Sequence, residues 1–362
     1  MVQAATRSVE TARGAMRLLA GRHTPFIENC WYVAGFAHEF SRKLKARTIL
    51  GRPLVLYRCQ DGSPAAMDDR CPHRSFPLSK SRLNGDTIVC GYHGLTYDRT
   101  GKCVAIPGED REPRGVGVRS YPLRVQGPLV WIWMGDAEPA ADLPLGDWAA
   151  DPMWPSSNAY FHLKASYIAL HENLLDLTHL SFLHAETFGT PDYALAPYEV
   201  DLDDEAGHFA VARSVIPTRL PPVWARPTGL EGRDAARVAR SEFLAPSLHR
   251  VSVRFWGCDV PEAERPDMVI TTAHLATPET ATSTHYFIHH ARNFAQADEG
   301  VTQFMHEQLT AAFQEDVDGL EAVEAMVAAT PPDDYYEISI AADRAGVAMR
   351  RWLHRQAERE RI

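Results

Sequence analysis

Two short segments of the chain each place a cysteine close to a histidine. The first is CPH at 71–73 and the second is CGYH at 90–93, with sixteen residues between them. Cys71, His73, Cys90 and His93 are therefore candidate ligands. Such a set binds either a Rieske [2Fe–2S] cluster, in which two Cys hold one iron and two His hold the other, or a single structural zinc ion. One such pair would mean little among 6 Cys and 16 His, but two pairs at short separation rarely arise by chance.

The residues around these pairs favour the iron–sulfur cluster. Pro72 stiffens the first loop, and Gly91 and Gly94 bracket His93 in the second. Glycine lets the backbone come close to a ligand, so that N–H groups can donate to cluster sulfurs. A third loop, 106–108, could cover the cluster. A zinc finger would carry both histidines on a helix, so a zinc-stabilised binding module is the weaker alternative.

A second group of candidate ligands lies between residues 173 and 184. Asn173, Asp176 and His179 are spaced i, i+3, i+6 and would share one side of a helix. His184 is five residues beyond His179, which corresponds to about 140° on a regular helix. Both imidazoles can face one metal ion only if the helix is irregular, and we expect that irregularity between Leu180 and His184.

A carboxylate that completes this group is expected on a long helix near the C-terminus. By helical angle Asp316 lies within about 60° of every member of the apolar stripe of that helix, and a carboxylate there is costly unless it is paired or binds a metal. Two histidines and one carboxylate form the facial triad of non-heme Fe(II) oxygenases, which leaves positions for O2 and substrate. A satisfied core histidine and a buried ion-pair partner are the simpler interpretations. The other acids, which point away from the stripe, are Glu315, Asp318 and Glu321.

The segments CPHRSFPLS (71–79), CGYHGLTYD (90–98) and 173–184 resemble the Rieske non-heme iron oxygenases, and the resemblance runs from about residue 29 to the last helix. The nearest branch is that of the vanillate O-demethylase-like oxygenase components. The resemblance implies that electrons from NAD(P)H arrive through a reductase or ferredoxin, and that O2 and a small aromatic substrate meet at Fe(II). The implied reaction is O-demethylation of a methoxylated aromatic acid with formaldehyde release, and the alternatives are N-demethylation and ring or side-chain hydroxylation.

The resemblance also implies roles for two further residues. Asp176 would bridge His93 of one chain to His179 of the next, which implies a homotrimer, and Asn173 would lie near the open face of the iron. From the residues alone, the Asp176 carboxylate could accept the free N–H of His179. The simpler interpretations are a solvated helix carboxylate and a structural hydrogen bond.

Other classes of protein remain as alternatives. A Rieske electron carrier would need only the first pair of motifs, and a metal hydrolase could use the triad without O2. No motif names the substrate, and Arg213, Arg254 and Arg292 are the candidate arginines for a substrate carboxylate.

Composition excludes some partners. The net charge of −10 disfavours nucleic acid, and no apolar run is long enough for a membrane span. No signal peptide is recognised, and Cys30, Cys59, Cys103 and Cys258 are interpreted as free thiols, so we expect a cytoplasmic protein. The segment from residue 68 to residue 124 contains ten basic and seven acidic residues, which gives it a net charge of +3. This charge suits either a docking face for an acidic electron donor or an ordinary solvated surface.

The pattern of apolar runs and turn signals predicts an α+β protein. We expect a tail or short helix at 1–26, an antiparallel β domain with the cluster at its loop tips at 27–135, a linker at 136–158, and a catalytic domain at 159–362. In the last, strands such as 161–168, 208–213, 248–256, 268–272 and 284–288 surround helices at 171–184, 302–329 and 341–360. The resemblance identifies this domain as a helix-grip fold.

Overall fold

The computed structural model describes residues 2–111 and 113–361, so Glu112, one of the acids counted above, lies outside the described residues. Backbone contacts divide the chain into two compact units. The small unit comprises Glu28–Leu143 with Thr277–Thr280, and the large unit comprises the residues up to Ile27, Pro144–Ala276 and the chain from Ala281 onward. The expected linker, 136–158, contains a short 3-10 helix, η3 (Asp147–Ala149), and the first residues of a strand.

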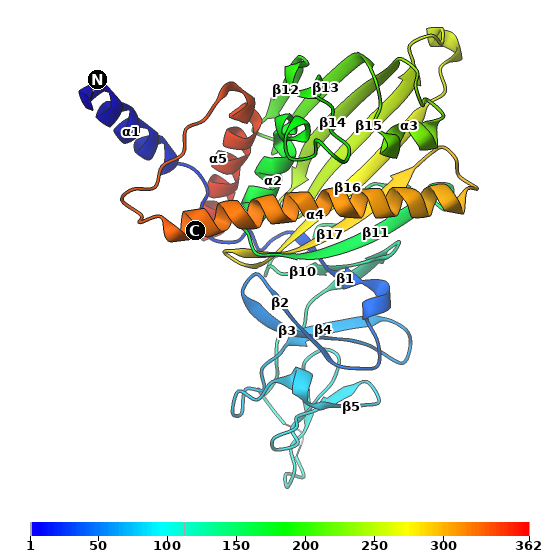
Figure 1. Ribbon diagram of the computed structural model, residues 1–362. Helices are drawn as coiled ribbons and strands as arrows, with labels where there is room; N and C mark the ends of the chain where they lie inside the picture. Colours follow the sequence, from blue (N-terminus) through cyan, green and yellow to red (C-terminus); the bar gives the residue numbers. More distant parts are fainter. Residues whose placement is uncertain (1, 112, 362) are drawn as a thin grey trace. The chain divides into compact units, whose positions relative to one another are not determined.

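The small unit is built from short antiparallel strands (Figure 1). Its described part forms three sheets, and β-branched or aromatic residues dominate strands such as β10. The first sheet is β1 (Trp31–Phe36), β10 (Leu129–Trp133) and β9 (Leu123–Gln126); the second is β2 (Lys45–Ile49), β3 (Arg52–Arg58) and β4 (Pro64–Asp68); the third is β5 (Arg82–Asn84), β6 (Thr87–Val89), β7 (Thr96–Tyr97) and β8 (Cys103–Ala105). Two single 3-10 turns, η1 (Ala37–Glu39) and η2 (Leu78–Lys80), lie between strands.

The described part of the large unit contains a seven-stranded sheet in the order β11-β17-β16-β15-β14-β13-β12. Strands β12 to β16 pair antiparallel in chain order, and β11 pairs antiparallel with β17. Buried residues alternate with more exposed ones from Val211 to Ile216 in β13, as expected where one face of a sheet lies on the core. The strands are β11 (Ser156–Leu163), β12 (Tyr198–Asp203), β13 (His208–Thr218), β14 (Ala235–Ala245), β15 (Leu248–Gly257), β16 (Met268–Thr280) and β17 (Ser283–Arg292).

The long helix α4 (Glu299–Ala329) lies across the sheet (Figure 1). It begins where Asp298 accepts a hydrogen bond from the backbone N–H of Val301, and it ends before two prolines at 331–332. Helices α2 (Tyr167–Leu175) and α5 (Arg344–Arg359) contact each other and pack against β14 and β12–β13 respectively. The remaining elements are α1 (Val2–Met16), α3 (Pro222–Thr228), η4 (Leu177–Ser181), η5 (Tyr193–Leu195), η6 (Glu262–Glu264) and η7 (Ala341–Asp343).

The predicted helical segment at 171–184 is divided into α2 and η4. Helix α2 ends at Leu175, and Asp176 has extended backbone angles of φ −112° and ψ 95°. The Asp176 side chain accepts a hydrogen bond from the N–H of Thr178 and starts η4, which shows how a short polar side chain competes with the helix backbone. The expected irregularity between Leu180 and His184 is present, because η4 ends at Ser181 and turns follow, and the break at Asp176 is an additional one that was not predicted. The expected strand at 161–168 is displaced, because β11 ends at Leu163.

No helix in the described part of the chain is both long and apolar enough to cross a membrane.

Candidate metal centres and active-site cavity

The two Cys–His loops of the small unit have the same backbone geometry. In the first, the N–H of Cys71 donates to Phe76 O at 3.0 Å and the N–H of Ser75 donates to Cys71 O at 2.8 Å. In the second, the N–H of Cys90 donates to Leu95 O at 2.8 Å and the N–H of Gly94 donates to Cys90 O at 3.0 Å. Ser75 and Gly94, four residues after each cysteine, both have positive φ, +60° and +77°. The chain therefore presents its two ligand pairs on two matching loops.

The cysteines and histidines of these loops are disposed differently. Cys71 and Cys90 are 1% and 3% exposed, whereas His73 and His93 are exposed, with ring centroids 4.5 Å apart. Among the described residues, no three of these four side chains bring ligand atoms within 4.8 Å of one another. Ligands of a single zinc ion, held at about 2.0–2.3 Å, would lie closer together than that. A two-iron cluster with thiolates on one iron and imidazoles on the other fits this separation better.

Two contacts support the cluster loops. The hydroxyl of Tyr97 lies 3.2 Å from Cys71 Sγ. A Cβ added to Gly94 would stand 2.8 Å from Pro107 Cγ, so the loop at 106–108 packs against the second ligand loop, and only glycine fits there.

In the large unit His179, His184 and Asp316 form a compact group whose ligand atoms lie within 4.8 Å of one another. Asp316 Oδ1 lies 3.1 Å from His184 Nε2 and 3.5 Å from His179 Nε2. Donor atoms about 2.1 Å from one ion and at right angles to each other would be about 3.0 Å apart. Two imidazole nitrogens and one carboxylate oxygen at this spacing fit the facial triad of a non-heme iron site.

Each histidine of this group has its other nitrogen held by the protein. His179 lies on η4 and its Nδ1–H donates to the backbone carbonyl of Asp176. The expectation that the Asp176 carboxylate accepts this N–H is therefore wrong, because that carboxylate caps η4 through Thr178. His184 Nδ1–H donates to Glu315 Oε2 at 2.7 Å, which leaves Nε2 toward Asp316. Such hydrogen bonds fix the tautomer and the ring orientation of a metal-binding histidine.

Asn173 and Glu315 surround the group more closely than the sequence indicated. Asn173 Nδ2 donates to Asp316 Oδ1 at 2.9 Å. Glu315, which by helical angle points away from the apolar stripe, also accepts a hydrogen bond from the hydroxyl of Thr187 at 2.7 Å. Glu315 and His184 meet because the turns after η4 carry His184 to the side of α4, and helical spacing alone contains no signal for that approach.

Burial and mutual charge set the protonation of this group. Burial lowers the pKa of His179 below its ordinary value, although the charge of Asp316 opposes the shift. For His184, burial acts in the same direction, but the hydrogen bonds and charges of Asp316 and Glu315 outweigh it and raise the pKa. For Asp316, burial acts to raise the pKa, yet the two histidines hold it below its ordinary value. The buried carboxylate is thus kept ionised, as a metal ligand must be.

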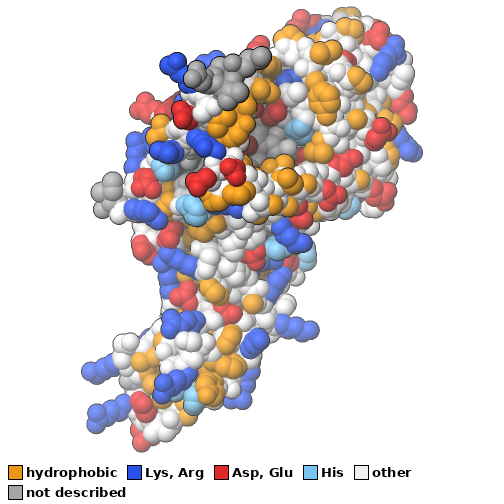
Figure 2. Space-filling view, turned by 60° about the vertical axis from the view of Figure 1, so that its left-hand side comes forward, with side chains coloured by type: hydrophobic (Ala, Val, Ile, Leu, Met, Phe, Trp, Pro, Cys, Tyr) orange, Lys and Arg blue, Asp and Glu red, His pale blue; other side chains and the backbone are white. Residues whose placement is uncertain are grey.

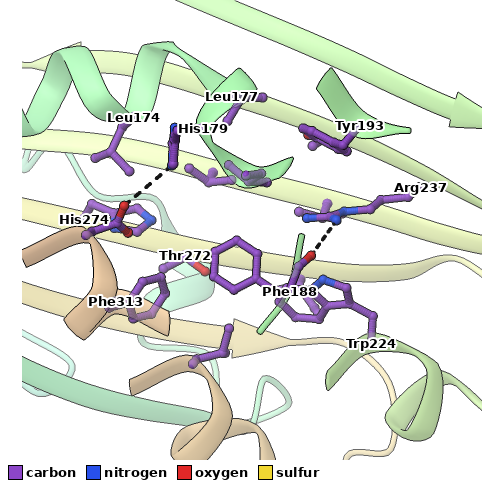
Figure 3. Close-up of a pocket in the computed structure, with 17 residues that line it drawn as sticks. Leu174, Leu177, His179, Phe188, Tyr193, Trp224, Arg237, Thr272, His274 and Phe313 are labelled. Atoms are coloured by element: carbon purple, nitrogen blue, oxygen red, sulfur yellow. Dashed lines mark hydrogen bonds and ion pairs between the residues drawn. The ribbon is translucent and has the colours of Figure 1, made fainter. Parts of the chain in front are cut away.

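Two members of the group, His179 and Asp316, line a narrow cavity between the sheet, α2 and α4, with a volume of about 60 Å³. Its walls are mainly apolar, and Figure 3 shows His179 and His274 on one side and Arg237, Trp224 and Tyr193 on the other. His274 is buried, which lowers its pKa to about 4, so the neutral imidazole is present near neutral pH. The cavity thus joins a metal-binding corner to a corner with a buried guanidinium.

The three arginines proposed from the sequence do not line this cavity. Arg213 and Arg292 are buried elsewhere, and the exposed Arg254 pairs with Asp267 at 3.0 Å. Arg237, which the sequence reasoning missed, is the arginine in the wall. It lies on β14, a strand that was not predicted, and no motif marks it in the sequence.

Both units of the chain match known protein families. Residues 163–359 match the vanillate O-demethylase oxygenase C-terminal domain, and residues 30–122 match the Rieske [2Fe-2S] domain. The chain belongs to the Rieske oxygenases of the vanillate O-demethylase type. It is thus an oxygenase component that uses a Rieske cluster and non-heme iron, takes electrons from a reductase or ferredoxin, and incorporates oxygen from O2. The predicted family, fold class, enzyme class and cofactors are confirmed.

Relatives cover nearly the whole Rieske oxygenase chain. The toluene-4-sulfonate monooxygenase system iron-sulfur subunit of Comamonas testosteroni is 36% identical over 91% of this chain and 96% of its own. The dicamba O-demethylase oxygenase component of Stenotrophomonas maltophilia is 33% identical over 92% and 99%. The crystal structure of dicamba monooxygenase bound to 3,6-dichlorosalicylic acid superposes with a TM-score of 0.86 at 30% identity, covering 93% of this chain and 99% of the other.

Proposed function

We propose that this oxygenase removes a methyl group from a methoxylated aromatic acid and releases formaldehyde. The observation that carries the proposal is the His179, His184 and Asp316 group at one side of an apolar cavity. The reaction takes up O2, two electrons and two protons; one oxygen atom enters a C–H bond of the methyl group, the resulting hemiacetal breaks into a phenol and formaldehyde, and the other oxygen atom leaves as water. Relatives named vanillate and dicamba O-demethylase support this choice.

Two sets of residues would bind the metal centres. We propose that Cys71, His73, Cys90 and His93 hold the cluster. His179, His184 and Asp316 would hold Fe(II), which when bound supplies the activation of O2.

Other residues support that iron site. Glu315 and the Asp176 carbonyl fix the two imidazoles, and Asn173 orients Asp316. Apolar walls exclude water and place the ring of the substrate against the metal corner.

Hydroxylation of a methyl group attached directly to the ring is the second candidate reaction. The toluene-4-sulfonate monooxygenase relative supports this reaction, because toluene-4-sulfonate carries a methyl group directly on its ring. That relative is 36% identical to this chain, and the dicamba relative is 33% identical. Both reactions insert one oxygen atom into a methyl C–H bond. They differ in the product, because formaldehyde is released only when the methyl carbon is bound to oxygen or nitrogen. N-demethylation therefore also releases formaldehyde, whereas ring hydroxylation does not.

We further propose that three copies of the chain form a ring, in which Asp176 connects His93 of one subunit to His179 of the next, with the Asp176 carbonyl holding His179 and its carboxylate meeting His93. A surface recess of the large unit supports this proposal, because Asn173, Asp176 and His179 all line it. A group docked in that recess would therefore lie next to a proposed iron ligand.

The small unit would also accept electrons from the reductase or ferredoxin. Lys and Arg side chains stand out around its lower part in Figure 2, which suits an acidic donor. The proposal of a cytoplasmic protein agrees with the described cysteines, because no disulfide joins any two of them.

The test is O2 uptake and product analysis with the reduced enzyme and a surrogate reductase. The substrates would be matched methoxylated, N-methylated, ring-methylated and unsubstituted aromatic acids. O-demethylation predicts formaldehyde equal to the O2 consumed with the methoxylated acids. An alcohol formed from the ring-methylated acids without formaldehyde from the methoxylated ones would replace the first candidate by the second.

A further inference from the structure

One corner of the cavity contains three buried hydrogen-bond donors that have no acceptor among the described residues. They are Arg237 Nε, Trp224 Nε1 and the hydroxyl of Tyr193, on side chains that are 2%, 4% and 0% exposed. All three residues line the cavity, and Figure 3 shows them grouped together, away from His179. Buried donors are nearly always paired in folded proteins, so three orphaned ones in one corner indicate a missing acceptor.

The guanidinium of Arg237 is fixed in this corner but lacks a counter-ion. Its Nη1 donates to Phe188 O at 2.9 Å, and its carbon lies 4.6 Å from the Tyr193 ring centroid and 5.8 Å from that of Trp224. Burial lowers the pKa of Arg237, and the charges of Tyr193 and of Asp192 act in the opposite direction. Asp192 Oδ1 is itself buried without a hydrogen-bond partner, and among the described residues no carboxylate forms an ion pair with Arg237. Arginine stays protonated in such surroundings, and an unpaired buried charge is strongly unfavourable.

The other buried arginines near the sheet show what a structural arginine looks like in this protein. Arg213 donates to Tyr193 O at 2.7 Å and to Thr178 Oγ1 at 2.6 Å, and Arg292 donates to two backbone carbonyls and to Thr302 Oγ1. Neither of them lines the cavity. The Nε of all three arginines has no partner among the described residues, so what distinguishes Arg237 is that it has one protein acceptor, Phe188 O, and that it lines the cavity.

We propose that Arg237, together with Trp224 Nε1–H and the Tyr193 hydroxyl, binds the carboxylate or sulfonate group of the substrate. The aromatic ring would then lie along the apolar walls, with its methyl group toward His179 and Asp316. This inference rests on the proposed function and adds to it the residues that select an anionic substrate. A planar guanidinium pairs with an oxyanion through two parallel hydrogen bonds, so Arg237 sets both charge preference and orientation.

The test is calorimetric binding to the holoenzyme without O2, which needs no turnover. The probes are 4-methoxybenzoate and toluene-4-sulfonate, each with its neutral amide as the matched control. We expect the wild type to bind each anion at least about 10-fold more tightly than its amide, and Arg237→Gln to lose about 10- to 150-fold in anion affinity with little change for the amides.

Further variants keep the test decisive if Arg237→Gln folds poorly. Arg237→Lys retains the positive charge but cannot form two parallel hydrogen bonds to an oxyanion. It should therefore lower the affinity for the anions without lowering the affinity for the amides. Trp224→Phe retains the ring and removes one donor, and a loss of about 3- to 10-fold is expected for the anions. Arg292→Lys is the control, because it changes a buried arginine that lies outside the cavity and donates to Ala295, Asp298 and Thr302, and it should leave the ratio of anion to amide affinity unchanged.

Three results would overturn the inference: equal affinity for anions and amides in the wild type, an unchanged ratio in both Arg237 variants, or no binding of either anion. Product formation with an unchanged ratio would leave the oxygenase reaction standing without this role for Arg237. Anion binding that depends on Arg237 but leads to no O2-dependent product would leave the anion site standing and remove the proposed reaction.

Discussion

Glu315 offers a quantitative test of how the iron site is built. Its carboxylate accepts the Nδ1–H of the fully buried His184 at 2.7 Å and also a hydrogen bond from Thr187. In Glu315→Gln the amide oxygen can still accept one of these hydrogen bonds, but the negative charge that strengthens His184 as a ligand is lost. Removing such a partner lowers metal affinity by about 10- to 100-fold, or roughly 1.4–2.7 kcal/mol.

The assay is anaerobic competition for Fe(II) between the protein and a chelator of known affinity. Asp318→Asn is the matched control, because Asp318 lies three residues away on α4, is exposed, and contacts Gln314. The visible absorption of the cluster serves as an internal control, since its proposed ligands belong to the other unit. Equal Fe(II) affinity in Glu315→Gln and Asp318→Asn would refute the reasoning.

Three further predictions concern other parts of the chain. The hydrogen bond between the Tyr97 hydroxyl and Cys71 Sγ favours the reduced cluster, and Tyr97→Phe removes it. A redox titration should therefore show a reduction potential lower by about 40 mV, and an unchanged potential would exclude that hydrogen bond. Burial lowers the pKa of His171 to about 4 and of His290 to about 3. Between pH 6.5 and these values both histidines are protonated in the unfolded chain and neutral in the folded chain. The free energy of unfolding should therefore fall by about 3 kcal/mol from pH 7.5 to 5.5. A melting temperature that does not change with pH would contradict this. Asp176→Asn should slow electron transfer from cluster to iron by about 10-fold or more in rapid-mixing experiments while iron content stays unchanged, and an unaltered rate would remove the bridging role.

The sequence was most informative where a local pattern meets a strong physical constraint. Asp316 was found because a carboxylate in an apolar helical stripe requires a partner, and the structure places it 3.1 Å from His184. The cluster loops were found because two Cys–His pairs with fixed spacing have few other uses. Five strands of the large sheet were predicted from runs of β-branched and aromatic residues, whereas β12 and β14 were not predicted.

The sequence was least informative where tertiary contacts decide. Asp176 was placed on a helix by its spacing, but its carboxylate forms a local cap that ends the helix, and this competition is decided by small energies. Glu315 meets His184 only because irregular turns bring the histidine to the side of α4. Arg237 lies on a strand that was not predicted, and its importance depends on which face of β14 forms the cavity.

The most direct test of the central claim is the iron and sulfide content of the wild type and of Asp316→Ala. We expect about three irons and two acid-labile sulfides per wild-type chain, of which two irons belong to the cluster. Asp316→Ala should retain about two irons, both sulfides and the visible spectrum of the cluster, and it should lose O2-dependent product formation. A third iron that survives in Asp316→Ala, or a wild type that turns over with only the cluster irons, would contradict the assignment of His179, His184 and Asp316 as the oxygenase centre.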